Sequence, residues 1–352
     1  MHYTQVYNSQ AVPAELARRI RVMPKVEIHV HLEGAAAAGL VFDMAQRNHV
    51  SLPAATPEAW QAFYAFRDFD HFIEIYLLAV ACMRTPQDFV DMVTHFMAQQ
   101  AAQNVQYSEV FVSAALHYGK FPPAELVAAL AEGARLGRER SGVEIAFIPD
   151  LSRQSCQERA LQEYVLAVAL HAREQGIGAG MGIGGNEVGY PPGLYRDIFA
   201  EARRQGLRVV AHGGETTGPE SVRGALDELG AERIGHGLSI LDDPVLAGEL
   251  AARRIPIEVS PQSNYCTRVV AWDRPHPIRR MLEAGLFCTL NSDDPQMFAT
   301  DLNNEYLTLA AQGFSFEELW ALNLNGLEAS FMDPAAKARR RAEWAPVGRL
   351  AP

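Results

Sequence analysis

Eight short apolar segments recur along the chain, and most are separated by longer stretches with apolar residues at helical spacing. The stretch "AELVAALAEGARLGRERSG" is one example, rich in Ala, Leu, Glu and Arg. Strands that alternate with helices build parallel sheets, and eight of them predict a (β/α)8 barrel, or TIM barrel, of the α/β class. The predicted strands are residues 25–30, 106–113, 143–149, 178–183, 207–211, 232–235, 255–259 and 286–291.

The connection between the first two predicted strands is far longer than the others. It contains "AFYAFRDFDHFIEIY", in which four phenylalanines lie three residues apart, a spacing typical of an amphipathic helix. Such an insertion could also cover the barrel mouth and supply apolar walls to a ligand. The four are Phe63, Phe66, Phe69 and Phe72. We therefore predict one barrel domain over residues 1–352, with a helical insertion at 35–105 and further helices after Leu302.

The length and charge of the chain limit its partners. Its 352 residues are enough for one large barrel, since single barrels often exceed ~250 residues. A formal net charge of -11 argues against a nucleic-acid backbone or an anionic membrane as the main partner, but permits a neutral nucleoside in a pocket. No segment approaches the ~18 apolar residues of a membrane span. The oligomeric state stays open at this point.

The cysteines and the N-terminal segment indicate the compartment. The four cysteines form no Cys-x-x-Cys pair and no evident disulfide framework, so we predict reduced thiols in a cytoplasmic protein. They are Cys82, Cys156, Cys266 and Cys288. The N-terminal "MHYTQVYNSQ" lacks the basic and apolar regions of a signal peptide, which agrees with that prediction.

Unusual polar and glycine residues cluster where the predicted strands end. In a TIM barrel the carboxyl ends of all strands meet on one face, and active sites lie on that face. We therefore expect these residues to share one site. They are His29 and His31 after the first strand, Gly184 and Gly185 after the fourth, His212 after the fifth, His236 after the sixth, and Asp293 and Asp294 after the eighth.

A metal site is the first interpretation of this cluster. His29 and His31 lie two residues apart on a strand, so both side chains point to the same face, but such a pair alone is weak evidence. With His212 and Asp293 at the same mouth, three imidazoles and one carboxylate suit one zinc ion, and a fifth position remains for water. Zinc lowers the pKa of such a water from ~15.7 towards ~7 and makes hydroxide available at neutral pH.

Glu215 and His236 are candidates for proton transfer. Glu215 follows His212 in "HGGE", where two glycines allow its carboxylate to fold back and move protons to and from a substrate. It could instead stabilise the start of the following helix. His236 lies in "GHG", whose glycines permit tight turns that expose the imidazole. It could act as a base, as an electrostatic stabiliser of an attacking water, or as a structural loop residue.

The segment "NSDDP" offers two neighbouring carboxylates whose side chains diverge. We therefore expect one of Asp293 and Asp294 to bind the metal and the other to bind substrate or water. One of them could instead cap the helix that begins near Pro295. Gly184 and Gly185 would let main-chain N–H groups approach a planar ligand, although a glycine pair alone is weak evidence.

The motifs "HVHLEG", "GGNE", "HGGE", "RIGHG" and "NSDDP" together resemble the adenosine deaminase family of the amidohydrolase superfamily. The resemblance extends from about Pro24 to Leu327, and the set is highly specific although each motif alone is not. It implies a (β/α)8 barrel, one zinc ion (Zn2+) and hydrolytic loss of ammonia from a 6-aminopurine. The segment "GAGMGIGG" has no lysine that could bridge two metals after modification, which also favours one ion.

The resemblance also implies roles for single residues. Glu215 matches the residue that protonates purine N1 while hydroxide attacks C6, and His236 matches the residue beside the attacking water. Asp294 matches the carboxylate that contacts N7, and Gly185 matches the glycine whose N–H meets N3. The residues that match the zinc ligands are His29, His31, His212 and Asp293.

Two departures from the family pattern concern the sugar end of the substrate. Glu33 stands where typical adenosine deaminases carry an Asp that meets the ribose 5'-hydroxyl, and adenine deaminases often carry Glu there. Asn186 stands where nucleoside-specific members usually have Asp. The motif "RIGHG", in contrast, looks more like the nucleoside branch, because adenine deaminases often have Asp before this histidine.

We therefore predict a deaminase of an adenine-containing nucleoside: adenosine, deoxyadenosine or a 5'-modified relative. Adenine deaminase and aminodeoxyfutalosine deaminase are the alternatives within this class of enzyme, and Glu33 is the residue on which the choice turns. A barrel that only binds a purine is the alternative from another class. It would require loss of a metal ligand or of the proton donor, and the sequence retains both.

Overall fold

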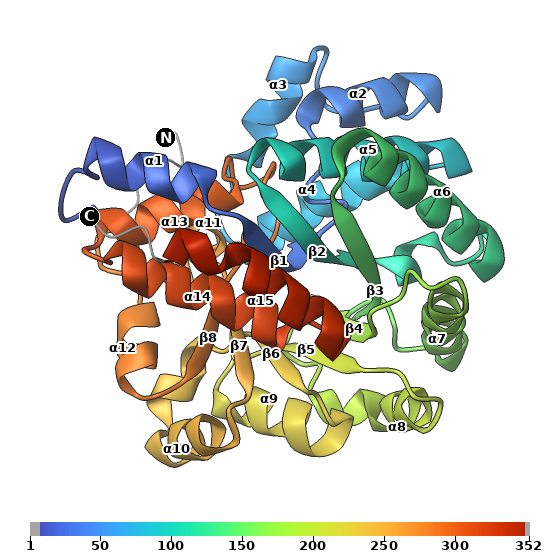
Figure 1. The fold of residues 1–352 in the computed structure, drawn as a ribbon. Helices are drawn as coiled ribbons and strands as arrows, with labels where there is room; N and C mark the ends of the chain where they lie inside the picture. The colour runs from blue at the N-terminus through green and yellow to red at the C-terminus, as the bar shows by residue number, and fades with distance from the viewer. Residues whose placement is uncertain (1–7, 349–352) are drawn as a thin grey trace.

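The computed structural model describes residues 8–348. Eight parallel strands form one sheet in chain order, from β1 to β8, and helices surround it (Figure 1). Between β8 and β1, Oδ1 of Asn291 accepts the Ile28 N–H at 3.0 Å. Just beyond, the His31 N–H donates to the Asp293 carbonyl at 2.8 Å. The predicted (β/α)8 barrel is therefore confirmed.

Each predicted strand corresponds to one strand of the sheet. The largest shifts affect the third strand, which continues to Ser152, and the fourth, which begins only at Met181. The strands are β1 (Lys25–His31), β2 (Val105–Val112), β3 (Glu144–Ser152), β4 (Met181–Gly184), β5 (Val209–Gly213), β6 (Arg233–His236), β7 (Pro256–Val259) and β8 (Phe287–Leu290).

The long first connection is helical, as predicted. Asp68 begins α4 by accepting the His71 N–H. The phenylalanine stripe packs inward: the rings of Phe66 and Phe72 lie 5.3 Å apart, and Phe72 lies 5.1 Å from Phe298, which follows β8. The helices of this connection are α2 (Ala38–Arg47), α3 (Pro57–Gln61), the short η1 (Ala62–Tyr64), α4 (Phe69–Ala81) and α5 (Pro86–Ala102).

The remaining helices follow the barrel pattern, and extra helices close the amino end of the strands. Asn323 of α14 accepts the Val26 N–H and donates to the Pro24 carbonyl at the start of β1. Figure 1 shows α14 and α15 across the front of the barrel. The helices are α1 (Ala14–Val22), α6 (Pro123–Ser141), α7 (Arg159–Glu174), α8 (Arg196–Arg204), α9 (Pro219–Gly224), α10 (Pro244–Arg253), α11 (Pro261–Cys266), α12 (Ile278–Glu283), α13 (Leu302–Ala311), α14 (Phe316–Ala329) and α15 (Pro334–Gly348). Four short helical turns complete the connections: η2 (Ala114–His117), η3 (Pro192–Tyr195), η4 (Ala225–Leu229) and η5 (Leu238–Asp242).

A charged network occupies the barrel interior. The guanidinium of Arg233 contacts Glu109 of β2, and its Nε lies 2.6 Å from Oε1 of Glu258 on β7. All three side chains are at most 1% exposed, so each charge depends on its partners for the stabilisation that water would otherwise give. The other oxygen of Glu258 lies 2.7 Å from Nδ1 of His29, and the network therefore reaches the mouth of the barrel.

The four cysteines, which the sequence predicts to be reduced thiols, are all free and buried. Within residues 8–348, none of the helices combines the length and the apolar character that crossing a membrane requires.

Replacing Arg233 with Met should destabilise the fold by ~3–5 kcal/mol, because Glu109 and Glu258 would stay buried without their cation. Urea unfolding of the purified variant would measure the loss. The matched control is Arg208→Met, since Arg208 also lies over the Phe331 ring but pairs with Glu232 at an exposed site. Exposed pairs contribute only ~0–1 kcal/mol, so similar losses in the two variants would contradict the structural importance of the network.

Candidate active site

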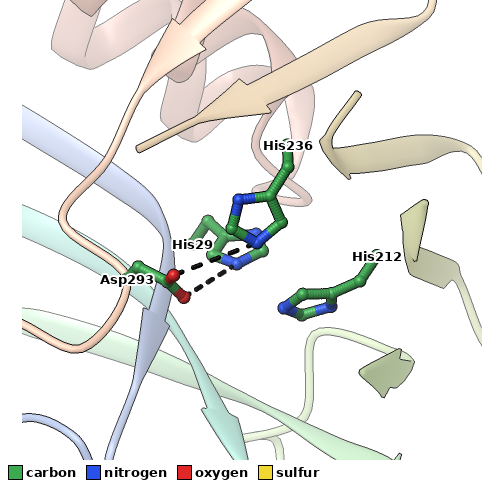
Figure 2. A group of neighbouring side chains, drawn as sticks. All are labelled: His29, His212, His236 and Asp293. Carbon is green, nitrogen blue, oxygen red and sulfur yellow. Dashed lines mark ion pairs between the residues drawn. The ribbon is translucent and has the colours of Figure 1, made fainter. Parts of the chain in front are cut away.

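The predicted metal ligands meet in one buried cluster at the carboxyl ends of the strands. Oδ1 of Asp293 lies 3.3 Å from Nε2 of His29 and 3.3 Å from Nε2 of His31. Nε2 of His31 lies 3.2 Å from Nε2 of His212. Figure 2 shows His29, His212, His236 and Asp293 pointing toward one another from separate parts of the barrel. Sequence positions far apart thus converge as predicted.

The donor atoms of this cluster fit a cation. Nε2 of His29 is buried and has no hydrogen-bond partner within residues 8–348. The potential ligand atoms fall into two overlapping groups, each within 4.8 Å, and Asp293 belongs to both. The groups are His29, His212, His236 and Asp293, and His31, Asp293 and Asp294. The predicted zinc set takes members of each group, and its exact membership stays a prediction.

Partners behind the imidazoles fix how two of them present their nitrogens. Nδ1 of His29 lies 2.7 Å from Oε2 of Glu258, and Nδ1 of His212 lies 2.9 Å from the Ile183 carbonyl oxygen. Both partners accept hydrogen bonds, so each Nδ1 carries the proton and each Nε2 keeps a lone pair for a metal. Sequence analysis did not identify Glu258; a carboxylate inside the apolar strand "IPIEV" was the available signal.

Glycines beside the cluster provide room for these rings. A Cβ at Gly235 would lie 2.7 Å from Cε1 of His29, and one at Gly184 would lie 3.1 Å from Cε1 of His212. The glycine before His236 in "RIGHG" is thus required for space, whereas sequence analysis attributed it to a tight turn. The glycine after it, Gly237, does adopt a left-handed φ of 62°.

His236 and Asp293 themselves have left-handed backbones, with φ of 63° and 64°. Such conformations cost about 1–3 kcal/mol each in residues other than glycine and persist where the surroundings enforce them. For Asp293 the enforcing contacts are the main-chain hydrogen bonds with His29 and His31. Strain of this kind, held at two site residues, is typical of a functional centre.

Glu187 holds the loop that carries Glu215. Its carboxylate accepts the N–H groups of Gly214 at 2.8 Å, Glu215 at 2.8 Å and Thr216 at 2.9 Å. The hydroxyl groups of Thr217 and Ser221 donate to it as well. Glu187, in the motif "GGNE", therefore positions the loop "HGGE". The sequence alone indicated no role for this glutamate.

The surroundings of Glu215 and Asp294 raise the pKa of both carboxyl groups. Burial, together with the carboxylates of Asp293 and Glu187, raises the pKa of Glu215 well above its ordinary value. Burial and the neighbouring Asp293 likewise raise the pKa of Asp294. Burial opposes ionisation of Asp293 too, but the adjacent imidazoles of His29 and His31 hold its pKa well below the ordinary value. The surroundings thus shift the pKa values of the two adjacent aspartates in opposite directions.

Glu33 and Asn186 both bond to protein groups. Oε1 of Glu33 accepts the Ser113 N–H at 2.9 Å and Oε2 accepts the Tyr76 hydroxyl at 3.2 Å. The side chain is 1% exposed and lies behind these two residues, which line the pocket. The Asn186 N–H donates to Gln154, and its side-chain oxygen accepts the Val188 N–H, so Asn186 shapes its own loop.

A pocket that is open to solvent leads to the cluster. Glu215, Asp294 and Gly185 lie on its wall with His31, His212, His236 and Asp293. Its outer part is apolar, formed by Phe69, Ile73 and Leu77 of α4 and by Leu116. Asp150, which sequence analysis missed, also lines it, and burial raises the pKa of that carboxyl to about 7.

A (β/α)8 barrel with imidazoles and carboxylates gathered at the strand ends defines the amidohydrolase type of metal-dependent hydrolase. A family model described as adenosine deaminase matches residues 24–343. The chain belongs to the adenosine deaminase family, and it is a deaminase, a hydrolase that acts on C–N bonds.

Individual relatives agree with this membership. The chain is 41% identical to aminodeoxyfutalosine deaminase of Streptomyces avermitilis, over 91% of this chain and 90% of that one. It is 38% identical to adenine deaminase of Trichlorobacter lovleyi, over 94% and 93%. A crystal structure of an amidohydrolase from Burkholderia ambifaria with bound Zn matches with a TM-score of 0.88 and 26% identity, covering 98% of this chain and 96% of that chain.

Replacing Glu215 with Gln should lower kcat by at least ~10²-fold while bound metal stays at the wild-type level, because the amide keeps the shape but has no proton to transfer. Steady-state kinetics and elemental analysis would measure the two quantities. The control is Glu220→Gln, an exposed glutamate in the first turn of α9. Near wild-type activity of the Glu215 variant would refute its role in proton transfer.

Replacing His212 with Ala should instead reduce the metal content, since the variant loses an Nε2 that faces the cluster. Elemental analysis after dialysis against metal-free buffer measures this directly. His171→Ala, at a half-exposed helix position, controls for loss of a histidine elsewhere. Equal metal content in both variants would remove His212 from the ligand set.

Proposed function

We propose that the protein is a zinc-dependent deaminase of a 5'-modified adenine nucleoside of the aminodeoxyfutalosine type. The observation that carries this proposal is the lining of the pocket, which joins the site residues to the apolar side chains of Phe69, Ile73 and Leu77. A free base would leave this outer wall in contact with water. Aminodeoxyfutalosine deaminases at 41% and 39% identity support this choice among the three nucleosides that the sequence predicted together: adenosine, deoxyadenosine or a 5'-modified relative.

The proposed mechanism assigns the purine end to residues already together in the pocket. When bound by His29, His31, His212 and Asp293, zinc supplies the Lewis acidity that makes water a nucleophile at neutral pH. Glu215 donates a proton to N1 while the water oxygen bonds to C6, so that the ring does not accumulate a full negative charge. Asp294 contacts N7 and the Gly185 N–H contacts N3. Glu215 takes up one proton of the water in exchange, the other water proton passes to the amino group as the C6–N bond breaks, and ammonia leaves with the 6-oxo product remaining.

Adenine is the second candidate substrate, and the surroundings of Glu33 favour it. Glu33 is 1% exposed and bonded to Ser113 and Tyr76, so this side chain fills space behind the pocket wall and is not presented to a sugar hydroxyl. An adenine deaminase with 38% identity to this chain supports the same reading. In either case the partner is a small purine, and the acidic chain is expected to act in the cytoplasm without nucleic acid or membrane.

A substrate panel of adenine, adenosine, deoxyadenosine and aminodeoxyfutalosine separates these candidates, read by loss of the adenine-type absorbance. We expect the highest kcat/KM for aminodeoxyfutalosine. Replacing Ile73 with Ser should lower that value by about tenfold, because losing apolar contact in a pocket costs ~1–3 kcal/mol, and should not affect adenine. Leu78→Ser, on α4 but outside the pocket wall, is the control. Turnover of adenine without turnover of any nucleoside would contradict the proposal.

A further inference from the structure

A chain of hydrogen bonds lies behind His236, on the side away from the pocket. Nδ1 of His236 lies 3.2 Å from the side-chain nitrogen of Asn264, on α11. The side-chain oxygen of Asn264 lies 3.1 Å from Nε2 of His276, in the loop before α12. Nδ1 of His276 lies 3.2 Å from the main-chain nitrogen of Ile278. The three side chains are at most 2% exposed, so water does not compete for these groups.

The donor and the acceptor of each hydrogen bond in this series follow from its last member, the bond between Ile278 and His276. The main-chain N–H of Ile278 can only donate, so Nδ1 of His276 accepts. Burial and the nearby His236 lower the pKa of His276 to about 3, so its neutral ring carries its one proton on Nε2. That N–H donates to the Asn264 oxygen, which leaves the Asn264 amide NH2 facing His236. Because an NH2 group only donates, Nδ1 of His236 must accept.

The opposite nitrogen of His236 faces oxygen atoms. Nε2 lies 3.7 Å from Oε2 of Glu215 and 3.9 Å from Oδ2 of Asp293. The carboxylate of Asp293 attracts an N–H at this position, whereas it would repel a lone pair. Both ends of the ring therefore favour the same tautomer, with the proton on Nε2.

We propose that Asn264 and His276 are positioning residues that hold His236 in its Nε2–H tautomer. In this form His236 donates a hydrogen bond to the attacking water and does not remove its proton, which decides between the roles that the sequence left open. The assignment rests on the proposed function for the presence of that water, but not on which 6-aminopurine is bound.

The same logic separates His236 from the metal ligands. One of its ring nitrogens lies within 4.8 Å of ligand atoms of His29, His212 and Asp293, so distance alone does not exclude it from a metal. A nitrogen that carries a proton has no lone pair in the ring plane to give to a metal. The ligand candidates His29 and His212 have acceptors behind them, whereas His236 has a donor. The hydrogen-bond partner behind each ring thus distinguishes an imidazole that can bind a metal from a neighbouring imidazole that cannot.

Nuclear magnetic resonance of the zinc-loaded protein labelled with ¹⁵N-histidine tests the tautomer directly. Ring ¹⁵N shifts distinguish a protonated nitrogen from one with a lone pair, and a His236→Gln variant assigns the signals. We expect a protonated Nε2 and an unprotonated Nδ1 at His236. A protonated Nδ1, in either the neutral or the charged ring, would overturn the proposal. This result does not depend on turnover, so it is distinct from failure of the proposed function.

Replacing Asn264 with Asp gives the kinetic test, because the shape is kept while an acceptor replaces the donor. The proton should move to Nδ1 of His236, and kcat should fall by ~10²-fold with little change in KM. Asn323→Asp is the matched control, a buried asparagine at the amino end of the barrel. It should keep the wild-type tautomer at His236. Equal kcat in the two variants would overturn the proposal, and the wild-type spectrum decides the matter if the Asn264 variant does not fold.

Discussion

The hydrogen bond between Nδ1 of His29 and Glu258 connects the catalytic end of the protein to the charges inside its barrel. Glu258 is held by Arg233, and Arg233 is shared with Glu109, so three buried charges depend on one another. An apolar interior would cost less free energy to bury, since a buried ion pair often gives no net stability. The network instead keeps a carboxylate behind His29, which fixes the orientation of that ring and leaves its Nε2 available to a metal.

The closure of the barrel brings the Asp293 carboxylate to His29 and His31. The segment after β8 bonds to the end of β1 through the main chain of Asp293, which places its carboxylate 3.3 Å from both histidines of the first strand. The left-handed backbone of Asp293 is the local cost of this geometry. Glu187 acts similarly for Glu215, since it gathers three successive N–H groups of the loop onto one carboxylate. Main-chain and carboxylate hydrogen bonds thus fix the positions of Asp293 and of the loop that carries Glu215.

Residues that carry chemistry themselves could be predicted from the sequence, because their types are unusual at the ends of apolar strands. The barrel and the meeting of His29, His31, His212 and Asp293 follow from that pattern. The supporting partners could not be predicted. Glu258 and Asn264 bond to residues on other strands, so no local spacing marks them. Glu33 was expected at the substrate, yet it bonds to Tyr76 and Ser113, because only the folded chain brings α4 beside β1.

We propose that this cluster holds one zinc ion, which the deamination requires. The zinc content of the purified wild-type protein tests this most directly, followed by deaminase activity after chelation and after return of zinc. We expect one zinc per chain, loss of activity on chelation and recovery when zinc is restored. Protein without bound metal that deaminates a 6-aminopurine equally well with and without added zinc would contradict it.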